Sequence, residues 1–173
     1  AKEAGLTVSC DLNFRKKLWK WKPGTNPKAL ARETMQSILP YVDVVIANEE
    51  DASDVLDIQI DDQDIHSGSL QVDRYPEVAK RIVSMFPNVK QVAITLRESL
   101  SASHNNWGAM LWDHASESAH FAPMQNDEYS PYEIKNIVDR VGGGDSFAAG
   151  LIYALTDSEL SAPTHAIQYA VAA

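Results

Sequence analysis

Hydrophobic positions along the chain alternate between short apolar runs and longer runs with helical spacing. Residues 6–12, 42–47 and 89–96 are rich in β-branched and other apolar side chains, and they predict buried strands. Residues 27–39 and 75–86 place their apolar side chains on one helical face, with a proline in the first turn of each. The sequence therefore predicts strands that are separated by amphipathic helices.

The order of these elements predicts the class of fold. Strands that alternate with helices imply right-handed crossovers and a mainly parallel sheet. Residues 108–112 and 118–122 predict two further strands, which we expect to form an antiparallel hairpin around residues 113–117, at the edge of the sheet. We therefore expect an α/β fold, with residues 1–173 forming a single domain.

Both ends and one internal stretch depart from this alternation. Residues 1–5 predict the last turn of a helix that ends at Gly5, and no helix start precedes it. Residues 166–173 favour a helix but lack a stop signal. We therefore expect the chain to be a fragment, truncated at both ends. Residues 58–69 are acidic and poor in large apolar side chains, and they predict a surface loop.

Composition narrows the class of function. A formal net charge of −9 argues against non-specific binding of nucleic acid, which needs clustered Lys and Arg. Cys10 is the only cysteine, so the chain can form neither an internal disulfide nor a Cys-rich zinc site. There is no apolar run long enough to span a bilayer and no signal-peptide pattern. These features favour a soluble cytoplasmic protein that acts on small molecules, without a membrane or nucleic-acid partner.

The segment with the clearest chemical signal is residues 137–151, which contains three consecutive glycines, Gly142, Gly143 and Gly144. Glycine lets a ligand approach the main chain closely. From Asp145 onward the spacing of apolar residues predicts a helix. The glycines therefore precede a helix N-terminus, where free N–H groups and the helix dipole favour anions such as phosphate.

Asp145 is unusual beside a phosphate site because its carboxylate would repel the ligand unless the charge is useful. One use is as a general base that takes the proton from a substrate hydroxyl as the hydroxyl attacks the γ-phosphorus. The other interpretation is that Asp145 caps the helix and interacts with its dipole. Both interpretations stay open on the local sequence.

Other phosphate and nucleophile motifs fit this segment less well. The P-loop pattern is absent, and Phe147 occupies the position of the third glycine of the dinucleotide-binding pattern. A serine hydrolase with Ser146 as nucleophile is a further alternative. Its weakness is that His165 is the only downstream histidine and lies in a predicted helix.

The spacing of Asp139, Gly142–Gly144 and Asp145, followed by Ser146 and Phe147, resembles the second signature of the PfkB carbohydrate kinase family, D-T-x-G-A-G-D-x-F. The resemblance implies a ribokinase-like fold of three α/β/α layers around a doubly wound sheet. It implies that Asp145 is the catalytic base, that the three glycines form an anion hole, and that Asp139 lies near a site for a monovalent cation, K⁺. Arg140 replaces the usual Thr, and Gly143 the usual Ala.

Two further segments resemble family motifs in the expected order. The stretch from Asn48 to Asp51 is similar to the N-x-x-E motif, which implies roles in phosphate and Mg²⁺ handling, with Asp51 in place of the final Glu. An acidic cluster at a helix start, which the helix dipole favours, is an interpretation that competes with the Mg²⁺ role; its members are Glu49, Glu50, Asp51 and Asp54. Asn48 before them is also a good helix N-cap. Thr95 and Arg97 stand where the family has T-x-G, which implies contact with ATP at the end of the third predicted strand.

The first predicted strand ends in a segment that resembles the D-x-N-x-R-x-x-L-W stretch of 2-keto-3-deoxygluconate kinases. The matching residues are Asp11, Asn13, Arg15, Leu18 and Trp19. Arg15 could bind a substrate carboxylate or a phosphoryl group through two hydrogen bonds, although a surface arginine is equally common.

The resemblance therefore implies a sugar kinase that transfers phosphate from ATP, with Mg²⁺, to 2-keto-3-deoxygluconate, giving the 6-phosphate. The alternatives are another kinase of the family, such as a fructokinase, or a nucleotide-binding domain without activity. Because family members have an N-terminal half that this sequence lacks, we expect the chain alone to be inactive. We expect the full-length protein to be a homo-oligomer.

Overall fold

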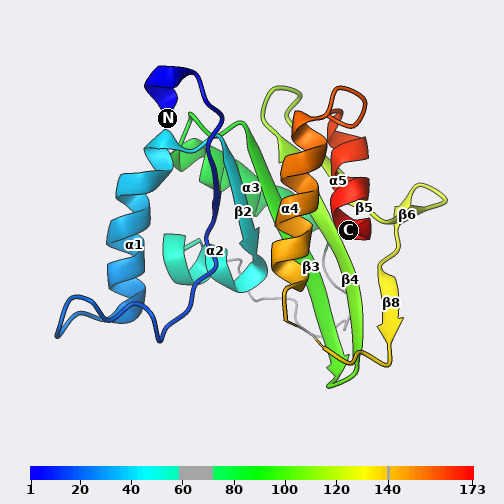
Figure 1. The fold of residues 1–173 in the computed structure, drawn as a ribbon, viewed down its shortest axis with the longest axis horizontal. Coiled ribbons are helices and arrows are strands. Elements are labelled where there is room, and N and C mark those ends of the chain that lie inside the picture. The colour runs from blue at the N-terminus through cyan, green and yellow to red at the C-terminus, as the bar shows by residue number, and fades with distance from the viewer. Residues whose placement is uncertain (59–71, 140) are drawn as a thin grey trace. The chain divides into compact units, whose positions relative to one another are not determined.

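The computed structural model describes residues 1–58, 72–139 and 141–173 (Figure 1). These residues form two compact units, residues 1–92 and residues 93–173. Of the surface loop predicted at residues 58–69, only Ile58 lies within the described residues, and it is buried.

The first unit contains the strand–helix alternation that the sequence predicts. Its elements are η1 (Lys2–Ala4), β1 (Ser9–Asp11), α1 (Pro27–Ile38), η2 (Leu39–Tyr41), β2 (Val44–Asn48), α2 (Glu49–Leu56), η4 (Val72–Arg74), α3 (Tyr75–Met85) and the first residues of β3 (Gln91–Ser101). Strands β1 and β2 pair in parallel, with Ser9 opposite Val44 and Asp11 opposite Ile46. This pairing confirms the predicted parallel arrangement for these two strands.

Local sequence signals set where the helices of this unit begin and end. The Asn26 side chain accepts hydrogen bonds from the N–H groups of Lys28 and Ala29, and Pro27 occupies the first turn of α1. Gly5 ends η1 in the left-handed conformation, with φ of 71°. Helix α1 buries Leu30 and other apolar residues, as the amphipathic spacing predicts.

The second unit contains most of β3, a group of antiparallel strands and two helices. They are β4 (His104–Asp113), β5 (Ser118–Ala122), β6 (Met124–Gln125), β7 (Glu128–Tyr129), β8 (Tyr132–Lys135), α4 (Gly143–Thr156) and α5 (Pro163–Ala172). Strands β3, β4 and β5 are neighbours in that order, and both β5 and β8 pair antiparallel with β4. The predicted hairpin is confirmed, with Asp113 opposite Ser118 beside its turn.

Helices α4 and α5 pack closely because Gly150 has no side chain. A Cβ atom on Gly150 would lie 2.8 Å from Cβ of Ala173 and 3.2 Å from Cα of Ala170. Phe147 and Leu151 on α4 and Ile167 on α5 are almost completely buried in the core of this unit. Within the described residues, no helix is both long and apolar enough to cross a bilayer.

Candidate functional site

The triple glycine forms the N-terminus of α4, as the sequence predicts. Gly142 is the N-cap, and its φ of 89° is a conformation that residues with a side chain rarely adopt. The Ser146 N–H donates to the Gly142 carbonyl at 2.8 Å and closes the first helical turn. No side chain caps this end, and Cβ atoms on Gly143 and Gly144 would meet no described atom within 4 Å apart from their chain neighbours and the backbone of the helix itself. The first N–H groups of α4 therefore face open space, where an anion can approach them.

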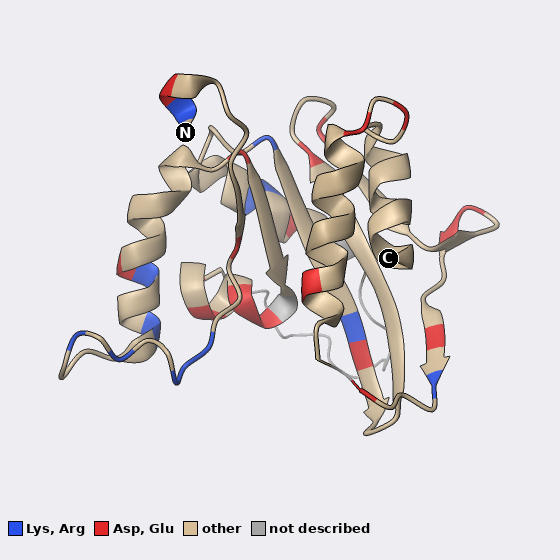
Figure 2. Ribbon diagram, in the orientation of Figure 1, with Lys and Arg blue, Asp and Glu red and all other residues tan. Residues whose placement is uncertain are grey.

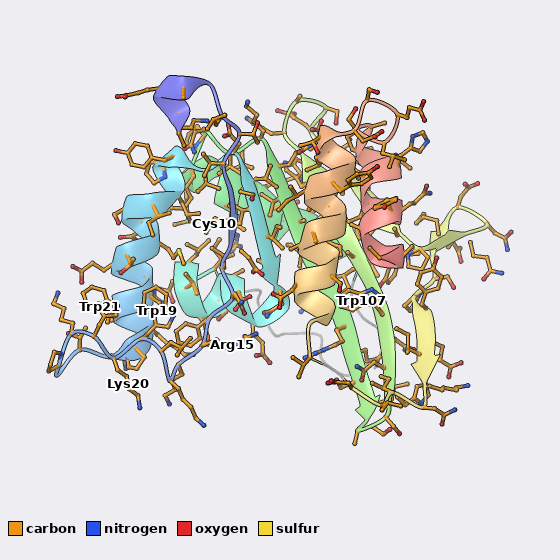
Figure 3. The ribbon with its side chains drawn as sticks, viewed as in Figure 1. Cys10, Arg15, Trp19, Lys20, Trp21 and Trp107 are labelled. Carbon is orange, nitrogen blue, oxygen red and sulfur yellow. The ribbon has the colours of Figure 1, made fainter. Side chains whose placement is uncertain are left out.

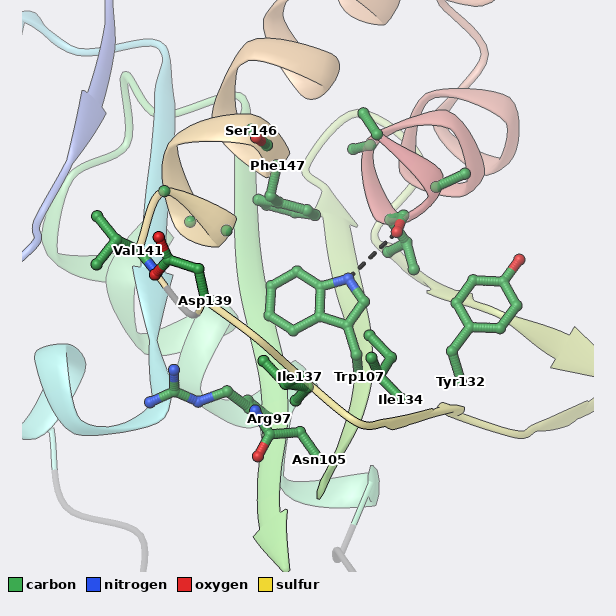
Figure 4. Close-up of a pocket in the computed structure, with 17 residues that line it drawn as sticks. Arg97, Asn105, Trp107, Tyr132, Ile134, Ile137, Asp139, Val141, Ser146 and Phe147 are labelled. Carbon is green, nitrogen blue, oxygen red and sulfur yellow. Dashed lines mark hydrogen bonds between the residues drawn. The ribbon is translucent and has the colours of Figure 1, made fainter. Parts of the chain in front are cut away.

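A cavity of about 710 Å³ lies beside this helix end, entirely within the second unit (Figure 4). It has the size of a site for a small organic ligand, and its wall is mostly apolar with a few polar groups. The lining residues are Arg97, Asn105, Trp107, Tyr132, Ile134, Ile137, Asp139, Val141, Gly142, Gly143, Gly144, Ser146, Phe147 and residues 170–173.

Trp107 on β4 holds one wall of the cavity in place. Its Nε1–H donates to the Val171 carbonyl of α5 at 3.2 Å, and its ring packs edge-on against Phe147 of α4, with the ring centres 6.1 Å apart. Asn105, also on β4, is 7% exposed, and its side-chain oxygen has no hydrogen-bond partner among the described residues. The cavity therefore offers flat apolar surface together with an unpaired hydrogen-bond acceptor.

Three residues assigned from the sequence have different relations to this cavity. Asp139 lines it, and one carboxylate oxygen accepts the Val141 N–H at 2.8 Å, which fixes the turn that leads into the glycines. Arg97 also lines the cavity and is exposed, whereas Thr95 is not among the lining residues. Both lie within β3 rather than at its end, because β3 continues to Ser101. The predicted strand end at residue 96 is wrong.

Asp145 is exposed in the first turn of α4 and lies outside the cavity lining, although its neighbours Gly144 and Ser146 belong to it. Successive residues of a helix point about 100° apart, so the carboxylate faces another side of the helix end than the cavity does. The N-cap is Gly142, and the side chain of Asp145 takes part in none of the hydrogen bonds between described residues. Its carboxylate is therefore accessible and has no structural partner in the described part of the chain.

A second group of predicted site residues lies in the first unit. Asp11 ends β1, and its carboxylate accepts the N–H of Asn13 at 3.2 Å. Asn13 adopts a positive φ of 35°, which asparagine tolerates better than most residues. Arg15 is exposed, and its guanidinium donates to the Phe14 carbonyl at 3.2 Å. Figure 3 shows Arg15, Trp19 and Trp21 along the loop that follows β1.

This loop concentrates positive charge in an acidic chain. Figure 2 shows the blue of Lys and Arg along this loop. Residues 15–22 contain five of the 15 basic residues of the sequence, and all five are exposed: Arg15, Lys16, Lys17, Lys20 and Lys22. Exposed cations raise the local concentration of anionic small molecules. The loop is therefore suited to receive a carboxylate or phosphate ligand.

Asn48 and Asp51 connect the end of β2 to the start of α2. The Asn48 side chain accepts the Asp51 N–H at 2.8 Å, and the Asp51 carboxylate accepts the Asn48 N–H at 3.2 Å, which together form a capping box. The other Asp51 oxygen accepts the Phe14 N–H at 2.9 Å. The capping interpretation of Asn48 is thus confirmed.

The burial of Asp51 affects both the pKa of its carboxyl group and its fit to a metal ion. Burial raises the pKa of this carboxyl above its ordinary value, and the hydrogen bonds from Phe14 and Asn48 and the nearby charge of Arg15 only partly oppose that effect. Within the described residues, no group of three or more His, Cys, Asp or Glu side chains could hold a metal ion. Both oxygens of Asp51 already accept backbone hydrogen bonds, so the carboxylate does not fit a direct Mg²⁺ ligand well.

Comparison with known proteins shows which enzymes the chain resembles. No family model matches the chain. It superposes over its full length on a 2-dehydro-3-deoxygluconokinase of Thermotoga maritima, with a TM-score of 0.79 and 40% identity, and covers 44% of that chain. A PfkB family carbohydrate kinase of Listeria grayi is 29% identical with a TM-score of 0.74, again over all of this chain and 44% of the other. Over its full length this chain resembles carbohydrate kinases, among them one of the PfkB family.

A shorter match points the same way. A 2-dehydro-3-deoxygalactonokinase of Haloferax volcanii is 43% identical over 61 residues, which are 35% of this chain and 17% of that protein. The chain thus spans less than half of the PfkB proteins that it matches. The ribokinase-like fold predicted from the sequence is confirmed, with helices flanking a sheet of mixed strand direction.

Sequence reasoning missed three residues that shape these sites. Trp107 and Asn105 line the cavity and belong to β4, which begins at His104, whereas the sequence predicts a strand that begins only at residue 108. Phe14 contributes its backbone N–H to Asp51, and backbone groups carry no residue-specific signal in a sequence. The alternating pattern Asn105, Trp107 and Ala109 along β4 could have suggested that these side chains share one face of the strand.

Proposed function

We propose that the protein containing this chain transfers the γ-phosphoryl group of ATP to a hydroxyl of 2-keto-3-deoxygluconate, also called 2-dehydro-3-deoxygluconate, giving the 6-phosphate. The observation that carries the proposal is the N-terminus of α4, where open glycine amides adjoin both a cavity and an unpaired carboxylate. The 40% identity to a kinase of this sugar acid supports the choice of substrate.

The residues of the second unit handle the nucleotide in this proposal. The cavity beside Trp107 receives the adenosine part of ATP, and Arg97 and Asn105 provide polar contacts within it. The amides of Gly142, Gly143 and Gly144 bind phosphate oxygens and stabilise the negative charge that develops on them during transfer.

Asp145 acts as the general base. Its exposed carboxylate takes the proton from the attacking hydroxyl, so that this oxygen can form a bond to the γ-phosphorus while the bond to the β-phosphate oxygen breaks. Asp139 keeps its predicted place near a monovalent cation, K⁺, and also holds the turn before the glycines through Val141.

The first unit supplies the sugar-acid contacts. Arg15 pairs with the substrate carboxylate, which a guanidinium can bind through two hydrogen bonds. Asp11 and Asn13 bind hydroxyl groups of the sugar. Asn48 retains the phosphate role that the N-x-x-E motif implies. Mg²⁺ would neutralise charge on the ATP phosphates, and it would need few protein carboxylates, because Mg²⁺ usually keeps several of its water ligands.

Replacement of the base tests the chemistry. In the full-length protein, Asp145→Asn should lower kcat by about a hundredfold to ten-thousandfold with little change in the KM for ATP. The matched control is Asp127→Asn, because Asp127 is exposed in the β6–β7 turn and its positive φ of 64° suits asparagine. Near-normal phosphoryl transfer by Asp145→Asn would show that another group is the base.

A panel of acceptors tests the substrate. The galactonate epimer differs from 2-keto-3-deoxygluconate in the configuration of one hydroxyl, whereas fructose has no carboxylate and carries an additional hydroxyl at C3. A preference for fructose would show that the substrate is a neutral hexose and not a sugar acid.

Calorimetry that detects ATP binding in the absence of any phosphoryl transfer would favour the non-catalytic alternative. No hydrogen bond between described residues joins Ser146 to a histidine, so nothing adds support to the hydrolase alternative.

A further inference from the structure

Asp51 has a contact that neither helix capping nor metal binding requires. Its side chain is 3% exposed, and one oxygen completes the capping box of α2 with the Asn48 N–H. The other oxygen accepts the N–H of Phe14, which is 37 residues away along the chain. A buried carboxylate is costly unless its oxygens are hydrogen-bonded, so this second contact offsets part of the cost of burying Asp51.

The Phe14 N–H attaches the start of the loop after β1 to the rest of the first unit, and Lys22, further along the loop, pairs with Glu33 of α1. Leu12 still donates to the Ile46 carbonyl at 2.9 Å, as a continuation of the β1–β2 pairing. Among the described residues, the N–H of Phe14 makes the only hydrogen bond that joins residues 13–21 to a residue outside that loop and β1. The position of Arg15, the next residue after Phe14, therefore depends on this hydrogen bond near the start of the loop.

The backbone on either side reinforces that dependence. Asn13 has a positive φ, and the N–H groups on both sides of it are held by aspartates. The Asp11 carboxylate accepts the N–H of Asn13, and the Asp51 carboxylate accepts the N–H of Phe14. A left-handed residue between two fixed amides sets the direction in which the chain leaves the strand. The guanidinium of Arg15 in turn donates to the Phe14 carbonyl, on the same residue that Asp51 holds.

We propose that Asp51 is a positioning residue that holds Arg15 in place for the substrate carboxylate through the N–H of Phe14, and that it is not a Mg²⁺ ligand. This inference rests on the proposed function for the identity of the substrate. The attachment itself is a property of the first unit alone.

Kinetics of Asp51→Asn in the full-length protein separate the two roles. Asparagine keeps the shape but replaces one acceptor oxygen with an N–H₂ donor, so the N–H of either Phe14 or Asn48 loses its partner. The KM for the sugar acid should rise by about tenfold or more, while the Mg²⁺ concentration that gives half-maximal activity stays unchanged. The control is Asp54→Asn, on the same helix one turn later, where the carboxylate pairs with Lys28; it should change neither value.

Coupling between residues tests whether Asp51 acts through Arg15. In an Arg15→Ala background, Asp51→Asn should add little further loss in kcat/KM, because the side chain that it positions is already absent. Asp51→Glu keeps two acceptor oxygens on a longer arm and should restore part of the affinity for the sugar acid. Independent, additive losses, or a higher Mg²⁺ requirement with an unchanged KM for the sugar acid, would overturn the proposal.

Amide hydrogen exchange tests the attachment without activity. In the wild-type protein the Phe14 N–H should be protected, and Asp51→Asn should speed its exchange by about tenfold to a hundredfold, while the Leu12 N–H keeps its protection. An unprotected Phe14 N–H in the wild type would refute the attachment even if Asp51→Asn does not fold. If the wild type phosphorylates no sugar acid, the proposed function fails, and the exchange result still decides whether the attachment exists.

Discussion

Asp43 provides the most direct test of how the first unit is held together. It lies just before β2 with 1% of its surface exposed. One carboxylate oxygen accepts Lys2 Nζ at 2.6 Å and lies 3.4 Å from Lys90 Nζ, and the other accepts the Val8 N–H at 2.9 Å. Asp43 thus ties the chain before β1 and the chain before β3 to the start of β2. The perturbation that we consider is Asp43→Asn.

The environments of the two lysines set the size of the effect. Removal of one partner from a fully buried ion pair costs about 3–5 kcal/mol, because a charge is left unpaired in the interior. Here the lysine side chains are 38% and 73% exposed, so water can solvate both ammonium groups after the substitution. The loss should therefore be that of the charge-assisted hydrogen bonds, about 2 kcal/mol, because the asparagine oxygen can still accept the Val8 N–H.

The effect should depend on pH with a definite sign. Burial alone would raise the pKa of Asp43, but the hydrogen bonds from Lys2, Val8 and Lys90 outweigh it and lower the pKa below its ordinary value. A carboxyl whose folded pKa is lowered stabilises the protein above its unfolded pKa, about 3.9, and loses that contribution as the pH falls through the folded value. The stability difference between wild type and Asp43→Asn should therefore be constant near pH 7 and shrink below about pH 4.

Urea unfolding followed by tryptophan fluorescence at several pH values measures this difference. Lys90→Ala is the control, because its long and exposed ion pair should contribute little to stability. A free energy of unfolding for Asp43→Asn within about 0.5 kcal/mol of wild type at pH 7 would refute the reasoning, as would a difference that does not change with acidification.

Three further predictions concern the second unit. Gly150→Leu should destabilise the protein by about 2 kcal/mol or more in urea unfolding, because its Cβ alone would lie 2.8 Å from Cβ of Ala173; wild-type stability would refute the close packing of α4 and α5. Phe147→Ala should cost about 3–5 kcal/mol in the same assay, because the ring is 1% exposed. ATP should change the fluorescence of Trp107 and raise the melting temperature, with about 2.7 kcal/mol of added stability at one hundred times its Kd. A signal that persists in Trp107→Phe would come from another tryptophan.

Features encoded within a few residues of sequence were predicted well. The three glycines open a helix, the hairpin turns where polar residues separate two apolar runs, and Pro27 lies in the first turn of α1. Each depends on backbone conformations or on apolar spacing that neighbouring residues alone determine. For this reason the N-terminus of α4 could be identified before its surroundings were known.

Features that depend on distant partners could not be predicted in this way. Strand β3 continues five residues beyond the predicted end, to Ser101, through a largely exposed stretch without an apolar pattern. Strand β8 has no buried residue, and it exists as a strand because it pairs with residues 104–107 of β4. The hydrogen bond between Phe14 and Asp51 joins residues 37 positions apart. Local periodicity contains no information about such pairings, which are set by the tertiary fold.

Asp51 and Asp145 show why environment decides the role of a carboxylate. Both occupy the third position of a helix, where the dipole favours negative charge. In α2 the N-cap is Asn48, which closes a reciprocal pair of hydrogen bonds and leaves Asp51 buried and bonded. In α4 the N-cap is Gly142, which offers no side chain, so the helix amides stay open and the carboxylate of Asp145 stays exposed. The N-cap, asparagine in α2 and glycine in α4, together with the N–H of Phe14 therefore separates a buried, hydrogen-bonded carboxylate from an exposed one that has no partner among the described residues.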